Sequence, residues 1–549
     1  MGQVKENIIA QKLRGGYYTP QAIADFLCQW SIDKNTKRIL EPSCGDGNFI
    51  ESAILRFKEL GIEGEDLKGR IKGIELLEEE SMKAKARAAN LGLNSNTIVN
   101  NDFFHYISSN GVEKYDAVIG NPPFIRYQSF PEEHRKLAIE MMQNLGLNPN
   151  KLTNIWVPFL VVSASLLKDN GRMAMVIPAE LFQVKYAAET RVFLSKFFER
   201  ITIITFKKLV FANIQQEVVL LLCEKKVQHG KGVRVIECEN LEELKSINFK
   251  AINGSNVKPI DHTTEKWTKY FLNEDEINLL RRLKKDKRVT TCGDIMEVDV
   301  GLVTGRNEFF MMKEEHVKEW KLKKYTIPVA SKSNQLKGIT FSEKDFSDNS
   351  KAQNAIHLFI PPNEDFEKLP KVCQKYIEYG EQQGFNTGYK TRIRKRWYIT
   401  PSLWVPDAFA LRQVGDYPKL ILNETGASST DTIHRVRFKE GVNRDIAAIS
   451  FLNSLSFAFS EITGRSYGGG VMTFEPTEIE EIQIPVLSDL DIEFDQVDAL
   501  IRQRKIEKVL DMVDDALLIK HHGFAKAEVE ILRGIWKKLS QRRNNRKRK

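Results

Sequence analysis

Residues 38–49 read RILEPSCGDGNF, and this stretch decides the fold expected for the first half of the chain. A short β-like run ends at Glu41, Gly45 and Gly47 follow, and a helical pattern begins directly after them. A strand, glycine loop and helix in this order let a small ligand approach the backbone. The third glycine of a dinucleotide-binding loop is absent, and no GKS or GKT follows, so a phosphate-binding loop is not predicted.

The residues around this corner alternate short β-like runs with longer helical patterns, from residue 13 to residue 225. Such alternation indicates parallel strands whose faces are covered by helices. We expect seven strands, in the stretches KRILEP (37–42), IKGIEL (71–76), NTIVNND (96–102), YDAVIGN (115–121), GRMAMVIP (171–178), ITIITF (201–206) and EVVLLLCEK (217–225). Helices are expected over 20–32, 80–92 and 153–171, with Pro158 in the first turn of the last one or at a kink. The predicted fold class is α/β with a seven-stranded, Rossmann-like sheet.

Polar side chains close the next three predicted strands. Glu75 ends IKGIE, Asp102 follows IVNN, and Asn121 follows AVIG. The carboxyl ends of parallel strands meet at one edge of the sheet, where such folds bind ligands. A carboxylate can accept hydrogen bonds from both ribose hydroxyls, and Asp102 can accept one from an exocyclic amine. Because the phosphate-binding loop is missing, the pattern favours a nucleoside without phosphates, and S-adenosylmethionine is the common one.

The stretch DAVIGNPPFIRY (116–127) adds a polar and aromatic corner at this edge. The side-chain oxygen of Asn121 and the carbonyl of Pro122 can accept the two N–H bonds of an aromatic amine and localise its lone pair. Pro122 and Pro123 hold the corner extended, and Phe124 can stack on a planar base. The same four residues could also form an ordinary turn with a core phenylalanine.

Taken together, GGYYTP (15–20), EPSCGDGNF (41–49), GIEL (73–76), NDFF (101–104) and GNPPF (120–124) resemble the γ-class N6-adenine DNA methyltransferases of bacterial restriction–modification systems. The resemblance implies transfer of a methyl group from S-adenosylmethionine to N6 of an adenine extruded from duplex DNA. It implies cofactor contacts at Tyr18, Thr19, Glu41, Pro42, Cys44, Gly45, Glu75, Asp102 and Phe103. It implies catalysis by Asn121, Pro122, Pro123 and Phe124. The family usually has Tyr where this chain has Phe124, which keeps the stacking face.

A second aromatic residue normally clamps the extruded base in this family, just before the last strand. The stretch LVFANIQQEVVLLL (209–222) has that position here. Phe211 is therefore a candidate, in addition to Phe124, for stacking on the target base. The alternative for Phe211 is a core position on an apolar strand.

The second half of the chain holds the run GYKTRIRKRWYI (388–399), in which cations alternate with aromatic residues. Such a run suits phosphate contact and base stacking, although a solvated charge run is the alternative. It nominates Lys390, Arg392, Arg394, Lys395 and Arg396 for DNA binding. The stretches VGLVTGRNEFF (300–310) and RSYGGGVMTFEP (465–476) also resemble segments of target-recognition domains.

We therefore expect four regions along the chain. They are a catalytic domain (1–228), a linker region (229–270), a mixed α/β target-recognition domain (271–487), and C-terminal helices with a basic tail (488–549). The net charge of +9 is concentrated in that tail, whose last thirteen residues contain eight basic and no acidic side chains. Six scattered cysteines without a CxxC pair favour a reducing cytoplasm and exclude a zinc cluster of that spacing. No membrane segment is predicted, no metal site is expected, and a monomer suits an asymmetric two-domain enzyme.

Two other functions remain open from the residues alone. Protein glutamine methyltransferases also use an NPP corner, but they are small and carry their recognition module before the glycine loop. An RNA substrate would need the same strand-end chemistry. A DNA-binding protein with an inactive methyltransferase fold is disfavoured by the intact corner and acids. A separate cognate restriction endonuclease is a partner that the resemblance suggests and the sequence does not decide.

Overall fold

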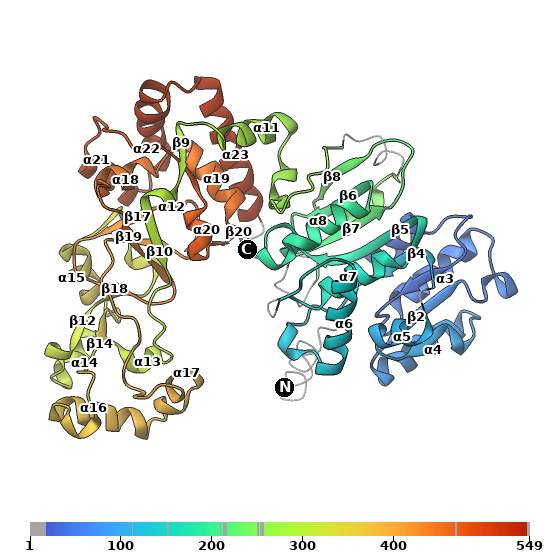
Figure 1. Cartoon of the computed structure of the whole chain (residues 1–549), viewed down its shortest axis with the longest axis horizontal. Coiled ribbons are helices and arrows are strands. Elements are labelled where there is room, and N and C mark those ends of the chain that lie inside the picture. Colours follow the sequence, from blue (N-terminus) through green and yellow to red (C-terminus); the bar gives the residue numbers. More distant parts are fainter. Residues whose placement is uncertain are drawn as a thin grey trace. The chain divides into compact units, whose positions relative to one another are not determined.

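The computed structural model describes residues 18–111, 113–150, 153–208, 210–211, 217–249, 252, 257–466 and 469–545. The chain divides into two compact units between Glu274 and Asp275 (Figure 1). We call them unit 1 and unit 2.

Unit 1 is built on one mixed sheet with the strand order β3-β2-β1-β4-β5-β7-β6-β8. The strands from β3 to β5 pair in parallel, β7 runs antiparallel to both of its neighbours, and β8 pairs with β6 in parallel. Their bounds are β1 (Ile39–Glu41), β2 (Ile71–Glu75), β3 (Ile98–Asn100), β4 (Tyr115–Gly120), β5 (Leu167–Pro178), β6 (Arg200–Phe206), β7 (Val218–Glu224) and β8 (Gly232–Cys238). The α/β class is confirmed, but the expected count of seven strands is wrong, because β8 adds an eighth.

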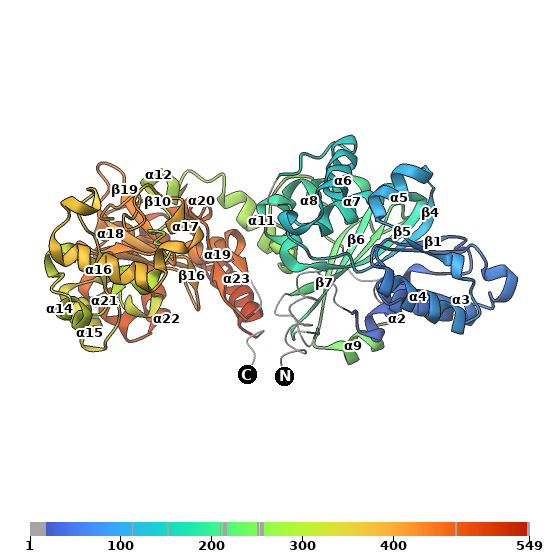
Figure 2. The same cartoon turned by 90° about the horizontal axis from the view of Figure 1, so that it is seen from below.

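Helices cover both faces of this sheet, as Figure 2 shows for α3 and α4 on one side and α6, α7 and α8 on the other. The helices of unit 1 include α2 (Gln21–Ser31), α3 (Asn48–Glu59), α4 (Glu78–Asn90), α5 (Phe103–Asn110), α6 (Glu132–Asn144), α7 (Trp156–Ser165), α8 (Ala188–Phe197) and α9 (Leu241–Ser246). Because successive strand residues point to opposite faces, one strand feeds two apolar cores. In β5, Met173 and Met175 face the core under α5 to α8, whereas Ala174 and Val176 face the core under α2 to α4.

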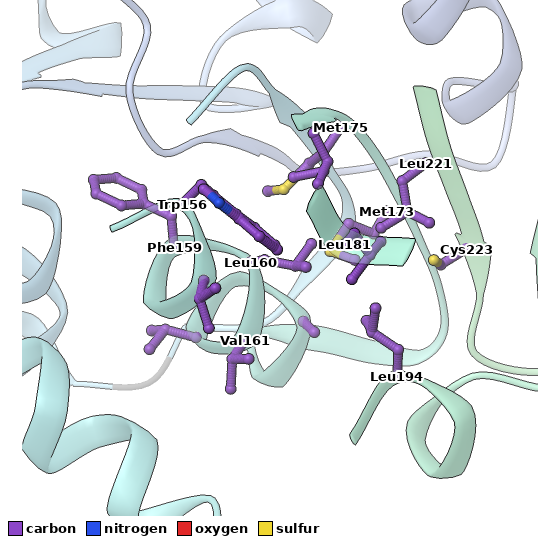
Figure 3. Close-up of a cluster of buried hydrophobic side chains, with 14 of the residues drawn as sticks. Trp156, Phe159, Leu160, Val161, Met173, Met175, Leu181, Leu194, Leu221 and Cys223 are labelled. Carbon is purple, nitrogen blue, oxygen red and sulfur yellow. The ribbon is translucent and has the colours of Figure 1, made fainter. Parts of the chain in front are cut away.

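Helix α7 is apolar on every side, which suits a helix buried between the sheet and other helices. Trp156 is fully buried, and its neighbours pack against Met173 and Met175 of β5 and Leu221 of β7 (Figure 3). Each fully buried side chain of this size stabilises the fold by roughly 1.5–3 kcal/mol. Pro158 lies in the first turn of α7, where its missing N–H removes no helical hydrogen bond, and that expectation is confirmed.

The helix expected over 153–171 is shorter in the structure, because α7 ends at Ser165 and β5 already begins at Leu167. Leu167 pairs with Tyr115 of β4, and the register then shifts so that Arg172 pairs with Ala117. Within the extra residues, the Lys168 ammonium contacts the Asp116 carboxylate at 2.9 Å. Pairing with β4 and this ion pair therefore override the helical pattern of the sequence.

Unit 2 is also mixed α/β and contains a five-stranded sheet (β10-β19-β15-β17-β13), a four-stranded sheet (β11-β14-β12-β18), a three-stranded sheet (β16-β21-β20) and the pair β22-β9. Its strands are β9 (Val289–Thr291), β10 (Met296–Asp299), β11 (Met311–Met312), β12 (Thr326–Ala330), β13 (Thr340–Phe341), β14 (His357–Phe359), β15 (Ala408–Leu411), β16 (Gln413–Val414), β17 (Leu420–Asn423), β18 (Ser428–Ser429), β19 (Ile433–Phe438), β20 (Arg465–Ser466), β21 (Met472–Thr473) and β22 (Gln483–Pro485). Its longer helices include α11 (Glu274–Leu283), α15 (Glu343–Lys351), α16 (Lys371–Gln382), α18 (Arg444–Ser450), α19 (Ser454–Thr463), α21 (Phe494–Arg502), α22 (Ile506–Val513) and α23 (Lys526–Asn544), and a π-helix, η11 (Asp514–His521), follows α22.

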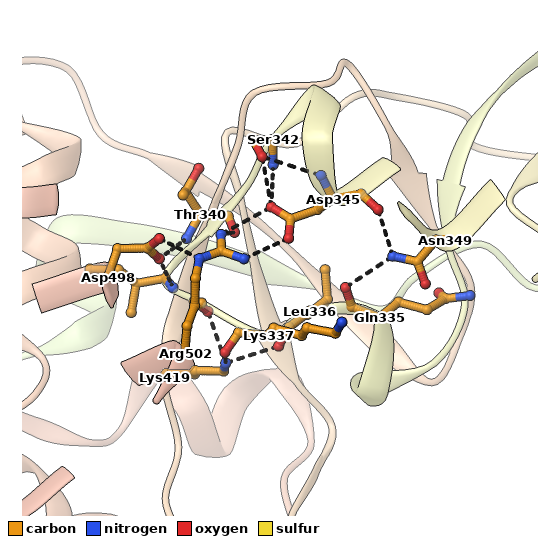
Figure 4. A network of polar contacts seen from close by, with 12 residues as sticks. Gln335, Leu336, Lys337, Thr340, Ser342, Asp345, Asn349, Lys419, Asp498 and Arg502 are labelled. Atoms are coloured by element: carbon orange, nitrogen blue, oxygen red, sulfur yellow. Dashed lines mark hydrogen bonds and ion pairs between the residues drawn. The ribbon is translucent and has the colours of Figure 1, made fainter. Parts of the chain in front are cut away.

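A buried polar network ties helix α21 to the five-stranded sheet (Figure 4). Asp498 accepts hydrogen bonds from the amide of Ile339 at 2.7 Å and from the guanidinium of Arg502 at 2.5 Å. Arg502 in turn donates to Asp345 at 2.6 and 3.0 Å. A Cβ on Gly338 would lie 2.1 Å from a carboxylate oxygen of Asp498, so this approach requires glycine.

Lys419 of unit 2 lies beside this network, and its side chain holds the loop that precedes β13. Its ammonium donates to the carbonyls of Leu336, Lys337 and Gly338 at 2.8–2.9 Å. Burial lowers the pKa of Lys419 to about 8, and the charges of Asp498 and Asp345 oppose that shift. Donation to three acceptors requires the ammonium form.

Two of the expected regional boundaries differ from the structure. Residues 229–270 are not a simple linker, because β8 completes the sheet and α9 packs beside α2. The expected C-terminal helices are present as α21 and α22, but they belong to unit 2 together with α23. The basic tail is helical up to Asn544, and residues 546–549 lie outside the described part of the chain.

The part of the chain that the structure describes holds no single helix long and apolar enough to cross a membrane. Helices α18 and α19 pass that test by length and composition only when taken together, with a 75° bend between them. Most of their side chains are buried in unit 2.

Candidate functional site

Four polar groups meet at the carboxyl edge of the parallel strands in unit 1. Glu41 is the last residue of β1, Glu75 the last of β2, and Asn121 follows directly on β4. Asp102 follows β3 and caps α5. The sequence predicted this edge correctly, because parallel pairing of β3, β2, β1 and β4 brings their ends to the same side.

The glycine loop between β1 and α3 folds back onto β2. The amide of Cys44 donates to the carbonyl of Ile74 at 2.9 Å, and the amide of Gly47 donates to the carbonyl of Cys44 at 2.8 Å. Gly47 has φ +93°, and a Cβ there would stand 2.9 Å from the Cα of Ala84 on α4. Only glycine therefore allows the start of α3 to pack this closely on α4.

Glu75 is held by backbone donors on both of its carboxylate oxygens. Gly45 of the glycine loop donates to one oxygen and Leu77 to the other, each at 2.8 Å. Burial raises the pKa of Glu75, and these two N–H groups oppose the rise. Each carboxylate oxygen has a second lone pair, so the fixed group can still accept from a ligand.

Glu41 is buried without a hydrogen-bond donor among the described residues at either carboxylate oxygen. Burial raises its pKa well above the ordinary value, and the like charges of Glu75 and Asp46 raise it further. The amide of Ser43 and the thiol of Cys44 approach it without hydrogen-bond geometry and partly oppose the shift. A buried carboxyl with no donor is costly to fold, and such groups gather at binding sites.

Gly120, the last residue of β4, makes room for this carboxyl. A Cβ on Gly120 would lie 2.7 Å from an oxygen of Glu41, and the residue has φ +155°. A side chain at the glycine of the GNPPF motif would therefore displace the Glu41 carboxyl from its present position.

Asp102 serves partly as a helix cap. One carboxylate oxygen accepts from the amide of His105 at 2.9 Å, and the same oxygen lies 3.5 Å from Nδ1 of His134 on α6. Burial raises the pKa of Asp102, and the His105 amide and His134 oppose the rise. His134 was not identified from the sequence, because it lies in a helix that follows the NPPF corner and carries no motif.

Phe103, expected to contact the cofactor, is 2% exposed and stacks on Phe159 of α7 with ring centroids 5.2 Å apart. Its ring therefore belongs to the apolar core in this structure. The prediction that it contacts a cofactor stays a prediction.

The Asn121 amide is connected to the segment that precedes α2. Its Nδ2 lies 3.1 Å from Oγ1 of Thr19, and the carbonyl of Thr19 accepts from the side-chain amide of Asn48 at 3.0 Å. Thr19 thus joins the corner after β4 to the first residue of α3. The hydroxyl of Ser43 also donates to the Asn121 carbonyl at 3.3 Å.

The rest of the corner is anchored by packing. Pro122 is buried, Pro123 is half-buried, and Phe124 is half-buried against both apolar cores of the sheet. The amide of Ile155 donates to the carbonyl of Ile125 at 3.0 Å, which fixes the chain beyond Phe124. Packing against both cores and this hydrogen bond therefore hold the corner in place.

The remaining residues expected at this edge have mixed positions. Pro42 and Cys44 are buried in the glycine loop, whereas Tyr18 is 48% exposed and its hydroxyl donates to Glu80. Phe211 is 5% exposed and belongs to the core under α2 to α4. Residues 212–216, next to it, lie outside the described residues. Stacking of Phe211 on a base would require it to leave this position and stays a prediction.

The cations of the 388–399 run divide into two groups in unit 2. Lys390, Arg392 and Lys395 are exposed. Arg394 donates to the carbonyl of Val303 at 2.8 Å, and Arg396 pairs with Asp365 at 2.7 Å. The latter two are engaged within the protein, which the charge pattern alone did not reveal.

The aromatic residues at the end of that run are internal. Trp397 packs on Phe309 with ring centroids 4.7 Å apart, and Tyr398 is buried with its hydroxyl on the carbonyl of Glu364. The expected alternation of cations and stacking aromatics is therefore absent at this end, because both rings complete a core.

Comparison with known proteins gives two family matches. Residues 5–315 match the family described as N-6 DNA Methylase, which is more than half of the chain. The chain belongs to this family. Residues 264–518 of this N-6 DNA methylase also match the C-terminal domain of the type II methyltransferase M.Eco57I. Helix α23 lies beyond both matched ranges.

Relatives match over most of the chain at low identity. The type II methyltransferase M.AccI of Acinetobacter calcoaceticus is 24% identical over 489 residues, which cover 85% of this chain and 84% of the relative. M.XamI of Xanthomonas campestris pv. amaranthicola is 19% identical and covers 87% of this chain and 86% of its own length. These relatives and the family match make this N-6 DNA methylase a DNA methyltransferase.

Two solved structures share its fold. The type IIL restriction–modification enzyme MmeI, in complex with DNA, aligns with TM-score 0.57 and 11% identity over 94% of this chain and 73% of that chain. The DrdV–DNA complex aligns with TM-score 0.50 and 13% identity, over 90% of this chain and 57% of that chain. At such identities the similarity concerns the fold alone.

Proposed function

We propose that this DNA methyltransferase transfers the methyl group of S-adenosylmethionine to N6 of an adenine extruded from duplex DNA. The observation that supports it most is the Asn121–Phe124 corner, which follows β4 at the same sheet edge as Glu41, Glu75 and Asp102. A site-specific modification of this kind would protect DNA from a restriction endonuclease, and the relative M.AccI is named a type II methyltransferase.

The residues at this edge fit the cofactor. Glu41 is a buried carboxyl whose oxygens meet no donor among the described residues, and a cationic ammonium group would supply both charge and donors. Glu75, fixed by Gly45 and Leu77, would accept from the ribose hydroxyls. Asp102 would accept from the exocyclic amine of the cofactor's adenine. When bound, S-adenosylmethionine supplies an electrophilic methyl group.

The corner after β4 would activate the target amine. The oxygen of the Asn121 side chain and the carbonyl of Pro122 accept the two N6–H bonds and favour a tetrahedral nitrogen with a localised lone pair. Thr19 holds the Asn121 amide from the other side. Phe124 offers its ring to the base. The nitrogen becomes acidic only after it is alkylated, so no strong base is required before transfer.

Base extrusion is required because N6 of a stacked and paired adenine cannot be reached. Unstacking costs a few kcal/mol, which contacts between the protein and DNA must offset. Exposed cations of unit 2 such as Lys390 and Arg392 would contribute phosphate contacts of this kind.

The test is transfer of labelled methyl from S-adenosylmethionine to mixed-sequence duplex DNA, followed by nucleoside analysis. We expect label in the deoxynucleoside of N6-methyladenine. Asn121→Ala should abolish transfer and leave cofactor affinity nearly unchanged, whereas Asn35→Ala, an exposed control, should behave as wild type. Label in cytosine, in RNA or in protein glutamine would overturn the assignment of substrate.

A further inference from the structure

Two segments of unit 2 that are far apart in the sequence form one surface. They are the loop 303–306 before α13 (Asn307–Phe310) and the short helix α17 (Tyr389–Arg392) with residues 393–395. Gly305 has φ +80°, and a Cβ there would stand 2.8 Å from the Cβ of Lys390. The loop and the helix therefore approach as closely as a glycine permits. We call these residues the 303/390 surface.

The 303/390 surface is attached to a rigid core. Arg394 donates to the carbonyl of Val303 at 2.8 Å, and its guanidinium lies 5.9 Å from the ring centroid of Phe310. Below it, Phe309 stacks on Tyr376 with centroids 4.7 Å apart and contacts Trp397. The hydroxyl of Tyr376 also donates to the carbonyl of Phe309. A surface supported in this way keeps its shape without a ligand.

Large apolar side chains point outward from the 303/390 surface. Tyr389 is 67% exposed, Ile393 is 61% exposed and Val303 is 39% exposed. Tyr389 is the first residue of α17 and Ile393 caps its C-terminus, a spacing of four residues that places them on the same side of the helix. Exposure of this extent by neighbouring apolar side chains is typical of contact sites.

Cations surround these apolar groups. Lys390, Arg392 and Lys395 are exposed, and Arg306 is half-buried beside Gly388. Residues 301–306 and 384–396 contain no acidic residue. Of the nearest acids along the chain, Asp299 pairs with Arg435 and Glu381 accepts from Trp397, whereas Glu308 is exposed. The four cations outnumber this single exposed carboxylate. The surface is therefore complementary to a polyanion.

We propose that the 303/390 surface contacts duplex DNA, with Lys390, Arg392 and Lys395 on phosphates and Tyr389 and Ile393 on bases in a groove. The positive charge of the surface indicates a polyanionic partner. Phosphate contacts alone do not distinguish one DNA sequence from another, because the bases carry the sequence information. The exposed apolar pair would supply that discrimination by contacting bases. This inference rests on the proposed function and assigns the two kinds of contact to different side chains.

The first test removes the three cations with Lys390→Ala, Arg392→Ala and Lys395→Ala. The matched control removes three exposed cations elsewhere in unit 2, with Lys344→Ala, Lys351→Ala and Lys508→Ala. Binding to labelled plasmid-derived duplex is measured by fluorescence anisotropy over a range of salt concentrations. The slope of log affinity against log salt should fall by about one for each lost phosphate contact, hence by about three. An equal change in the control triple variant would overturn the phosphate assignment.

The second test removes the apolar pair with Tyr389→Ala and Ile393→Ala. Its control is Val486→Ala with Ile531→Ala, an exposed apolar pair outside the surface. Binding is compared between a duplex with the methylated site, mapped by sequencing of treated plasmid, and a scrambled duplex of equal length. The Tyr389/Ile393 variant should lose at least tenfold in discrimination between the two duplexes while its salt slope stays that of wild type. Unchanged discrimination would overturn the base contact.

These experiments separate the surface from the proposed reaction. If the wild type binds duplex DNA but transfers no methyl group to adenine, the proposed function fails, and the salt series on mixed duplex still tests the cations. If the wild type methylates adenine and the surface variants bind DNA and discriminate between duplexes as the wild type does, the proposed DNA contact of the 303/390 surface is wrong. Equal affinity for duplex RNA would also overturn the choice of partner.

Discussion

Glu41 is the residue whose environment most directly predicts a measurable behaviour. Its pKa is raised by burial and by the like charges of Glu75 and Asp46, so the folded protein holds a proton that the unfolded chain releases. The free energy of unfolding of unit 1 should therefore decrease as the pH rises from the ordinary glutamate range through the raised pKa. A bound cation favours the ionised form, so cofactor affinity should increase over that same interval and binding should release protons.

Glu41→Gln should remove both effects and weaken cofactor binding. Titration calorimetry with S-adenosylmethionine in two buffers of different ionisation enthalpy counts the protons released. The exposed Glu59→Gln serves as the control, since its side chain lies on the far end of α3. Equal proton release by Glu41→Gln and wild type would show that another group titrates.

Thr19 gives a second prediction at this scale, because its hydroxyl holds the Asn121 amide at 3.1 Å. Thr19→Val keeps the shape and removes that partner, so kcat should fall about tenfold, which corresponds to a hydrogen bond of about 1.4 kcal/mol. Thr19→Ser should retain most of the activity. The cofactor Kd distinguishes the roles: an unchanged Kd with lower kcat indicates positioning, whereas a weaker Kd with unchanged kcat indicates only cofactor contact.

Single residues show what the sequence could and could not predict about the site. Glu75 and Asn121 could be found because each ends a recognisable strand and parallel pairing brings such ends together. The contact of Thr19 with Asn121 spans 102 positions and follows no period, so no local pattern could reveal it. The same holds for the approach of Glu41 to Gly120, which only the packing of β1 on β4 produces.

At the scale of elements, Lys419 predicts how firmly the loop before β13 is held. Lys419→Met keeps the length of the side chain and leaves the carbonyls of Leu336, Lys337 and Gly338 without their donor. Hydrogen bonds to a charged group contribute about 1.5–3 kcal/mol each, so we expect unit 2 to lose about 2–3 kcal/mol after relaxation. Urea unfolding measures the loss, with the exposed Lys344→Met as control. A loss no larger than that of the control would contradict this role.

Elements also show where sequence patterns are ambiguous. The apolar run from Trp156 reads as one helix up to Gly171, yet the chain leaves the helix at Ser165 and joins the sheet. The cause is non-local, since Lys168 meets Asp116 of the neighbouring strand. The sequence of the 388–399 run likewise predicts one charged and aromatic surface. The structure divides it, because Trp397 and Tyr398 are needed by the core beneath.

At the scale of the whole molecule, α23 is the element that completes unit 2. Its Arg543 is buried and pairs with the buried Glu461 of α19 at 2.9 Å, and it also donates to the carbonyls of Gly470 and Asp416. Burial raises the pKa of Glu461 and Arg543 opposes the rise. Arg543→Met would leave the carboxylate uncompensated, so unit 2 should lose about 3–5 kcal/mol.

Scanning calorimetry should detect that loss as a lower unfolding temperature of unit 2, with the transition of unit 1 unchanged. Lys537→Met on the same helix removes a surface pair with Glu507 and should cost less than about 1 kcal/mol. The double variant Glu461→Gln with Arg543→Met should recover part of the stability. Equal effects of Arg543→Met and Lys537→Met would refute the buried-pair argument.

The division of the chain was predicted in outline and misplaced in detail. An α/β unit followed by a second mixed α/β unit is present. The stretch after residue 229 has many polar residues and turn formers, so it resembled a linker, but β8 pairs with β6 along its whole length. Pairing between distant strands is not encoded in local composition, which explains the error.

The boundary at Glu274 and Asp275 has a consequence for how such proteins diversify. Every strand-end group of the candidate site lies before residue 125, whereas the 303/390 surface lies wholly after residue 300. Recombination at this boundary would keep the residues of the proposed methyl transfer together. It would replace the surface proposed to contact DNA and so change the recognised DNA sequence. Descendants could then acquire new target sites by recombination, without passing through intermediates in which the chemistry has been damaged.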